Sequence, residues 1–264
     1  MEYVRQMGDA TSRETVTMRF RAGGATIEAT AELPAEPVSL ANLVPFLQAV
    51  EQSIVETATA AVAEERKTIS CRAGCGACCR QIVPVSLAEV EYLARLVASM
   101  PDDERAAVER RFATALAALE RAGLGEELRA ANTQRDASDT HDFGIRYFLA
   151  GVACPFLIDE SCSIHPHRPL ACREYLVTSP AVNCASPEAN TIERVAVPRD
   201  LSRALYRLGD GADSSIRWVP LVLALEWVRT HGPLPTAPAK ELLAALAREV
   251  KGAPDGAPRP TTGA

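Results

Sequence analysis

Cysteine is the residue type whose spacing in this sequence of 264 residues points most directly to chemistry. Four of the eight cysteines lie within nine residues, and the other four lie within thirty-one. In chain order they are Cys71, Cys75, Cys78 and Cys79, followed by Cys154, Cys162, Cys172 and Cys184. Thiolates two to four residues apart on a loop can bind zinc, and thiolates also hold iron–sulfur clusters. Random burial of inert thiols does not produce such clustering, so we predict that all eight are metal ligands.

The first cluster contains an adjacent cysteine pair, Cys78-Cys79, next to Gly74 and Gly76. The two glycines allow the backbone to turn tightly between ligands. Neighbouring side chains point in different directions, so Cys78 and Cys79 are expected to be chemically unequal. Cys78 has the usual two-residue gap from Cys75, which favours it as the primary ligand, while Cys79 faces a second metal, a cluster edge or the core.

The second cluster is spread over three short motifs, CPFL, CSIH and RPLACR, with Cys184 twelve residues beyond them. Neither cluster is complete alone, so we expect the two loops to converge on a shared site. The sulfurs expected to share one metal are those of Cys75, Cys78 or Cys79, Cys162 and Cys172. Cys184 is the weakest member and could belong to the core. His165 and His167 are alternative zinc ligands, although surface histidines beside prolines are commoner.

Arginine dominates the basic residues, because only three of the 28 are lysine. Arg72, Arg80, Arg168 and Arg173 lie close to cluster cysteines in the sequence. A centre of four thiolates around zinc or a [4Fe–4S] cluster has a net negative charge, which guanidinium N–H groups could offset. We predict this cofactor-binding role for Arg168 and Arg173; the alternative is that an arginine-rich chain places arginines everywhere.

The elements that position these loops are mainly helical. Alternation around Gly23-Gly24 predicts a β-hairpin, and Ser86 with Glu89 forms a capping box that opens a helix. Asp142 is expected to cap a short segment ending near Phe148. Apolar periodicity predicts further helices at about 39–65, 102–121, 198–208, 215–230 and 239–250, of which 215–230 is expected to be buried. The fold class is therefore mainly α, a helical bundle with an N-terminal β-hairpin and two metal-binding cysteine-rich loops.

The same patterns predict how the chain divides. The expected segments are 1–13, disordered; 14–67, hairpin and long helix; 68–185, the cysteine-cluster metal-binding domain; 186–251, C-terminal helices on the same core; and 252–264, a disordered tail.

Composition narrows the function classes. Hydrophobic residues make up 47% of the chain, enough for a core, and the net charge of −6 argues against a nucleic-acid partner. No apolar run is long enough to span a membrane, so a membrane partner is not expected. The sequence also has no secretory signal, so a cytoplasmic location is expected. The chain contains no GxGxxG, Walker or HExxH motif, and whether it is an enzyme stays open.

The motifs Cys75-Gly76-Ala77-Cys78-Cys79, CPFL, CSIH and RPLACR together resemble the YkgJ-type cysteine-cluster family, the CxxCxxCC domain, over roughly residues 68–176. The resemblance implies a zinc- or iron-chelating domain. This sequence departs from the family pattern in its first spacing, three residues instead of two, and at His165, where relatives usually carry tyrosine. The domain also resembles part of flagellin lysine N-methylase, which would imply iron–sulfur-dependent methyl transfer to a protein.

Three functions follow from the possible states of the site. A site closed by four thiolates is structural and suits a module that binds a protein partner. An open coordination position would allow catalysis. A redox-active cluster would allow electron transfer, redox or metal sensing, or the methylase-like chemistry.

Overall fold

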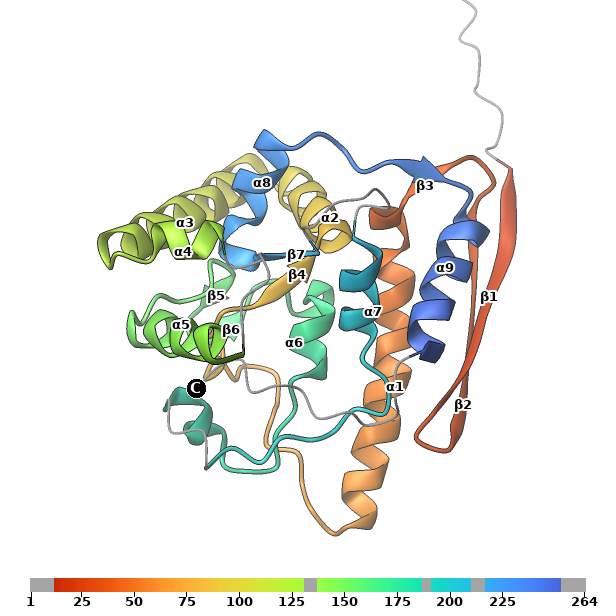
Figure 1. The fold of residues 1–264 in the computed structure, drawn as a ribbon, viewed down its shortest axis with the longest axis horizontal. Helices are drawn as coiled ribbons and strands as arrows, with labels where there is room; N and C mark the ends of the chain where they lie inside the picture. Colours follow the sequence, from red (N-terminus) through yellow and green to blue (C-terminus); the bar gives the residue numbers. More distant parts are fainter. Residues whose placement is uncertain (1–11, 131–136, 187–190, 210–216, 253–264) are drawn as a thin grey trace, which may run out of the picture.

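The computed structural model describes residues 12–130, 137–186, 191–209 and 217–252. Within these ranges the fold is mainly α, and the strands form only small antiparallel pairs (Figure 1). The longer helices are α1 (Val44–Glu64), α2 (Leu87–Ala98), α3 (Asp102–Arg121), α5 (Ala137–Leu149), α7 (Leu201–Leu208) and α9 (Ala239–Gly252). The shorter ones are α4 (Gly125–Arg129), α6 (Leu170–Glu174), α8 (Ala224–Thr230) and the 3₁₀ turns η1 (Leu40–Leu43), η2 (His165–His167), η3 (Ala181–Ala185) and η5 (Leu221–Leu223). The predicted fold class is thus confirmed at the level of helix content.

The predicted hairpin consists of β1 (Arg13–Ala22) and β2 (Ala25–Pro34). Gly23 and Gly24 connect the strands, and both have positive φ, 55° and 82°, as a tight hairpin turn requires. The remaining pairs join distant segments: β3 (Val38–Ser39) with β8 (Thr236–Ala237), β4 (Pro84–Ser86) with β7 (Trp218–Pro220), and β5 (Leu157–Ile158) with β6 (Ser161–Cys162).

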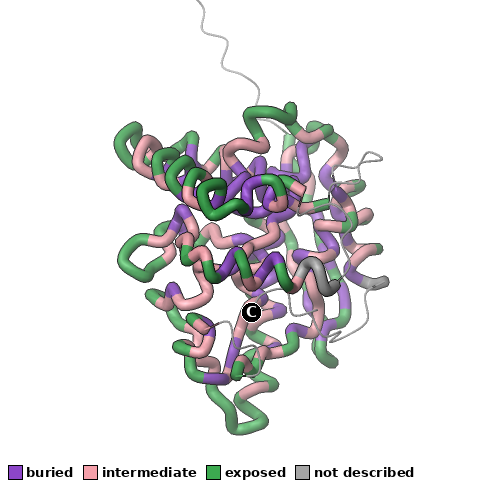
Figure 2. The backbone as a smooth tube through the Cα atoms, turned by 60° about the vertical axis from the view of Figure 1, so that its left-hand side comes forward, coloured by how far each residue is buried: buried purple, intermediate pink, exposed green. Residues whose placement is uncertain are grey.

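Buried apolar side chains form two clusters instead of one bundle core. The first, here called the hairpin core, lies between the inner face of the hairpin and α1, α7 and α9. The second, here called the helical core, lies between α2, α3, α4, α5 and the segment Val219–Ala224. Figure 1 shows α6 between these two groups, and Figure 2 shows the buried segments in the interior. Leu170 of α6 belongs to the hairpin core, whereas the neighbouring Ile164 belongs to the helical core.

Local sequence explains where the helices begin. The α2 helix opens with the predicted capping box, in which the Ser86 hydroxyl accepts from the Glu89 N–H and the Glu89 carboxylate accepts from the Ser86 N–H. The α1 helix begins at Val44, later than predicted, because a 3₁₀ turn precedes it. Asp142 lies inside α5, so its prediction as a cap was wrong.

The predicted helix over 215–230 was also wrong in its first part. Trp218–Pro220 is a strand and only Ala224–Thr230 is α-helical. Pro220 lacks an N–H and forces Val219 into extended backbone, which favours strand pairing with Val85. Burial is concentrated in Val219–Ala224, and α8 itself is exposed towards its end, so the expectation of a fully buried helix was wrong.

The predicted terminal disorder concerns residues that lie mostly outside the described part of the chain, although Arg13 begins β1. In the described part, no helix has both the length and the apolar content needed to cross a membrane.

Candidate metal centre

The two cysteine loops are adjacent and are joined by backbone hydrogen bonds at both ends of the first loop. At one end, the Ser70 N–H donates to the Val177 carbonyl over 2.9 Å. At the other end, the Cys154 N–H donates to the Cys79 carbonyl over 2.7 Å. The predicted convergence of the two clusters is therefore present in the fold, although they are more than seventy residues apart in sequence.

The middle of the first loop packs against the β5–β6 hairpin of the second. A Cβ atom added at Gly76 would lie 2.8 Å from the Glu160 carbonyl oxygen and 2.7 Å from Cδ1 of Leu157. Glycine is therefore required here for close approach of the two backbones. Arg80 extends this contact with a bidentate ion pair to the Glu160 carboxylate, at 3.0 and 2.5 Å. Arg80 thus joins the two loops.

Two buried carboxylates fix α6, the short helix that carries Cys172. Glu89 accepts from the Leu170 N–H at the start of α6 over 2.7 Å, in addition to its capping bonds on α2. Glu174, at the end of α6, accepts from the N–H and the hydroxyl of Ser202 on α7. The sequence showed the local capping role of Glu89, but it carried no signal for the bond to Leu170, because that partner is 81 residues away.

All eight cysteines are free thiols; Cys184 is buried and the other seven are half-buried. Burial raises the pKa of Cys154 to about 12 and that of Cys184 to about 11. Burial also raises the pKa of Cys172 well above its ordinary value. Without a cation these thiols stay protonated at neutral pH, and a bound metal would have to displace their protons.

Cys78 interacts electrostatically with cysteines of both loops. A hydrogen bond with Cys79, followed by burial, raises its pKa strongly. A negative charge on Cys78 in turn raises the pKa of five other cysteines: Cys71, Cys154, Cys162, Cys172 and Cys184. Cys184 is buried in the core, and both its role as a ligand and its role as a core residue stay predictions.

The two predicted cofactor-binding arginines differ in what they contact. Arg173 donates from Nε to the Arg168 carbonyl over 3.0 Å and also donates to the Pro166 carbonyl, so it braces the backbone of this turn. Arg168 has a buried Nε with no hydrogen-bond partner. Burial raises the pKa of Cys71, Cys162 and Cys172, and a hydrogen bond with Cys79 raises that of Cys78; the positive charge of Arg168 opposes each of these rises without reversing it. Arg168 is therefore the arginine whose charge acts on the thiols of both clusters.

Neither candidate histidine is placed among the sulfurs. The Nδ1 atom of His167 forms a hydrogen bond of 2.7 Å with the Tyr92 hydroxyl. The pKa of His165 is lowered by burial and by the charges of Arg168 and Arg173, with no cysteine contributing. Arg72 is exposed on the first loop.

Tyr175 is a member of the site that the sequence reasoning missed. Its carbonyl accepts from the Cys71 thiol, with an Sγ–O distance of 3.8 Å. Its hydroxyl accepts from Gln81, and the Arg194 guanidinium lies 4.6 Å from the centre of its ring. Burial raises the pKa of Cys184, and a hydrogen bond with the Tyr175 side chain opposes that rise in part. Its position three residues after Cys172 was the only available signal.

The residues present fit a thiophilic metal or an iron–sulfur cluster by their chemistry: many convergent thiols with an unpartnered guanidinium N–H beside them. They are not arranged as a finished coordination sphere. In the described ranges, no three His, Cys, Asp or Glu side chains are grouped closely enough to hold one ion. The expected tight set of four sulfurs is thus not seen, and metal binding would require the thiols to draw together.

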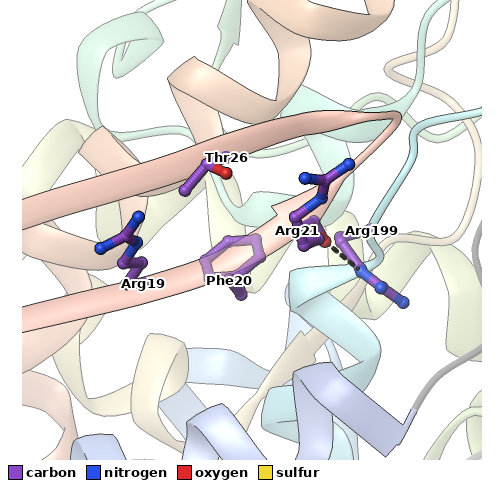
Figure 3. A pocket seen from close by; sticks show the side chains of 5 residues that line it. All are labelled: Arg19, Phe20, Arg21, Thr26 and Arg199. Atoms are coloured by element: carbon purple, nitrogen blue, oxygen red, sulfur yellow. Dashed lines mark hydrogen bonds between the residues drawn. The ribbon is translucent and has the colours of Figure 1, made fainter.

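A separate hollow of about 540 Å³ lies at the turn end of the β1–β2 hairpin. Figure 3 shows Arg19, Arg21 and Arg199 around it, and Arg199 Nε donates to the Arg21 carbonyl over 2.8 Å. Phe20 and Thr26 complete its lining. None of the lining residues is a cysteine or another predicted metal ligand, so this hollow is distinct from the cysteine site.

Residues 70–194 match the family model of the CxxCxxCC domain, described as a putative zinc- or iron-chelating domain. No curated protein and no solved structure matches the chain.

Proposed function

We propose that this protein binds zinc or an iron–sulfur cluster through the cysteines of its two adjacent loops, which lie within the residues that match the model of a putative zinc- or iron-chelating domain. The observation that carries the proposal is the direct hydrogen bonding between the two cysteine loops, from Ser70 to Val177 and from Cys154 to Cys79. The buried Nε of Arg168, which has no hydrogen-bond partner, adds a positive charge that acts on thiols of both loops. This combination supplies soft anionic ligands together with a positive charge that offsets them.

Each part of the site has a defined task in this proposal. The cysteines bind the metal as thiolates, and their protons leave to solvent when it binds. Arg168 donates its free N–H to a thiolate and reduces the repulsion among the sulfurs. Glu89, Glu174 and Arg173 hold α6 and the preceding turn in place, so that Cys172 faces the first loop.

The high pKa values of the thiols favour an exchangeable centre as a second candidate. Burial raises the pKa of Cys154 and Cys172, so protons compete with a metal for these sulfurs. A metal held at such a site can respond to metal supply or to oxidants, as a redox or metal sensor does. We propose this role together with an as yet unidentified protein partner.

The test is anaerobic purification followed by measurement of zinc, iron and sulfide per chain, with an absorption spectrum. Absorbance near 400 nm with iron and sulfide indicates an iron–sulfur cluster, whereas colourless protein with stoichiometric zinc indicates a zinc site. Cys78→Ser should reduce the metal content, and Ser99→Ala on the distant end of α2 should not. A folded wild-type protein that takes up neither zinc nor iron would overturn the proposal.

A further inference from the structure

The first strand of the β1–β2 hairpin has a free edge that lies outside the cysteine site. Its even-numbered residues from Val16 to Ala22 are buried in the hairpin core, so its odd-numbered side chains point towards solvent. In a hairpin with a two-residue turn, the pair that flanks the turn is hydrogen-bonded, and here that pair is Ala22 with Ala25. The backbone N–H and C=O groups of the odd-numbered residues therefore point away from β2.

The position of Arg199 agrees with this orientation. Its Nε donates to the Arg21 carbonyl over 2.8 Å, which requires that carbonyl to lie on the outer edge of β1. Among the described residues, β1 has backbone pairing with β2 alone, and Figure 1 shows it at the border of the molecule. The register with β2 runs from Arg13 to Ala22 without a bulge. The strand thus presents a continuous edge of ten residues.

The charge along this edge indicates what can pair with it. The exposed odd-numbered residues are Arg13, Thr15, Thr17, Arg19 and Arg21, so every charged side chain among them is positive. A β1 strand from a second copy would bring like charges together, which is unfavourable. An extended segment with acidic side chains at alternate positions would instead place them beside Arg19 and Arg21, which are two residues apart on one face.

The turn end of the edge is arranged for anionic groups. Figure 3 shows Arg19, Arg21 and Arg199 spread around the hollow, with their guanidinium groups well apart. In the described part of the chain, the Arg21 guanidinium has no hydrogen-bond or ion-pair partner. Arg19 contacts Glu28 at 3.5 Å, but both side chains are exposed and such pairs are weak.

Close packing at the turn holds Arg199 in this place. A Cβ atom added at Gly23 would lie 3.1 Å from Cβ of Pro198, so the turn packs directly against the residue before Arg199. The hollow is therefore formed by two segments distant in sequence, the hairpin and the segment before α7.

We propose that the outer edge of β1 binds an extended acidic segment of a protein partner as an added strand. The outward backbone groups from Arg13 to Arg19 pair with this segment, and Arg19, Arg21 and Arg199 bind its carboxylates at the turn end. Arg199 occupies the Arg21 carbonyl, so the pairing ends there. The proposal does not depend on the metal, because none of these residues belongs to the cysteine loops.

The probe is a labelled synthetic peptide of about ten residues, the upper length of common strands, in which threonine and glutamate alternate. Fluorescence anisotropy measures its binding to the full-length protein. The wild type should bind it, and Thr17→Pro should abolish binding, because proline removes an outward N–H and leaves the pairing with β2 in place. Thr30→Pro is the matched control on the edge of β2. The hydroxyls of Thr17 and Thr30 lie 3.0 Å apart in a hydrogen bond, so both variants lose that contact and only one alters the β1 edge.

A second pair of variants tests the charge. Arg21→Glu should weaken peptide binding roughly 10-fold, because it replaces an attraction with a repulsion. Arg110→Glu, at an exposed position of α3, changes the net charge equally and should leave binding unchanged. Circular dichroism shows which variants are folded, and Arg21→Glu decides the question if either proline variant is not.

Several results would overturn the proposal: no binding by the wild type, equal binding by the two folded proline variants, or equal binding by the two charge variants. Equal affinity for a peptide with lysine in place of glutamate, or for a single-stranded oligonucleotide, would overturn the acidic partner. Dimerisation of the wild type that Thr17→Pro removes would show a second copy on the edge and would also overturn it. Zinc and iron content of the same samples tests the metal proposal separately.

Discussion

At the scale of single residues, Arg168 and Arg173 form a matched pair. Comparing them separates the electrostatic effect of an arginine on the thiols from its hydrogen bonding to backbone carbonyls. Removing Arg168 with Arg168→Gln should weaken zinc affinity roughly 10-fold or more, because outer partners of metal ligands typically contribute 10–100-fold. The stability of the metal-free protein should change little, since the Arg168 Nε has no hydrogen-bond partner to lose. Competition titration with a chromophoric chelator measures the affinity.

Arg173→Gln is the matched control, and its expected pattern is the opposite. It removes bonds to the Arg168 and Pro166 carbonyls, so metal-free protein should lose about 1–3 kcal/mol of stability, as for charged hydrogen bonds in general. If Arg168→Gln and Arg173→Gln lowered zinc affinity by the same factor and lowered the stability of the metal-free protein by the same amount, the distinction between the two arginines would be contradicted.

The thiols also make a prediction about alkaline pH. Unfolded cysteines ionise near pH 8.5, whereas burial holds the pKa of Cys184 at about 11 and that of Cys154 at about 12 in the folded, metal-free protein. Groups whose folded pKa is raised stabilise the fold below their unfolded pKa and lose that effect as the pH rises towards the folded value. The melting temperature of the metal-free protein should therefore fall between about pH 8.5 and 11.

Zinc-loaded protein is the control for this pH series, because its thiolates are already deprotonated. Its melting temperature should fall less over the same range. Parallel curves for the loaded and metal-free proteins would contradict buried, protonated thiols.

At the scale of elements, the contact between the first loop and the β5–β6 hairpin depends on Gly76. Gly76→Ala should destabilise the protein by about 1–3 kcal/mol, as overpacking does, because the added Cβ would meet backbone that cannot rotate away. It should also reduce zinc affinity by separating the loops. Gly74→Ala is the comparison: its φ of 81° is strained for alanine, yet nothing lies within 4 Å of the added Cβ.

Urea unfolding and zinc titration on both glycine variants decide this point. Gly74→Ala should cost about 1–2 kcal/mol from backbone strain alone and should leave the Cys79–Cys154 junction intact. A larger loss of zinc affinity in Gly74→Ala than in Gly76→Ala would contradict the proposed role of close packing.

Glu89 links α2 to α6, and this link also gives a testable outcome. Glu89→Gln replaces one accepting oxygen by an NH₂ group, which cannot accept from the N–H groups of Ser86 or Leu170. A buried donor left without an acceptor costs about 1–3 kcal/mol, so the free energy of unfolding should fall by this amount. Glu109→Gln on the exposed side of α3 should change it by less than about 0.5 kcal/mol. Equal effects of the two substitutions would contradict the link.

The elements were predictable where local sequence determines them. The hairpin around Gly23-Gly24 and the capping box of α2 both follow from a few neighbouring residues, and both were confirmed. The segment Trp218–Leu223 was mispredicted because its apolar periodicity suits a helix, whereas Pro220 and pairing with β4 impose a strand. Pairing between distant segments is a tertiary effect that periodicity does not encode.

The candidate site was predictable in composition more than in geometry. Cysteine clustering identified the two loops, and incompleteness of each loop predicted that they would meet. The different tasks of Arg168 and Arg173 could not be predicted, because the two residues have similar sequence surroundings and differ only in which carbonyls lie within reach. The contributions of Tyr175 and Glu174 likewise depend on contacts with residues distant in the chain or in other elements.

At the scale of the whole molecule, a metal between the loops would connect the hairpin core and the helical core, since α6 and its preceding turn contribute to both. Binding that occurs only in the folded state stabilises by about 4 kcal/mol at a thousandfold excess over Kd. Loading with zinc should therefore raise the melting temperature by roughly 10 °C, at 2–4 °C per kcal/mol for a protein of this size. Calorimetry of metal-free and loaded protein measures the shift, and bound zinc with no change in melting temperature would show that the site is peripheral.

The pairing of early with late segments has a consequence for synthesis on the ribosome. All eight cysteines have been made by residue 184, but the helical core needs Val219–Ala224 and the hairpin core needs α9. The β4–β7 and β3–β8 pairs likewise wait for the last fifth of the sequence. Chains still being translated therefore present a full set of reactive thiols without the surrounding cores. We expect the nascent protein to depend on a reducing environment until its C-terminal segments emerge.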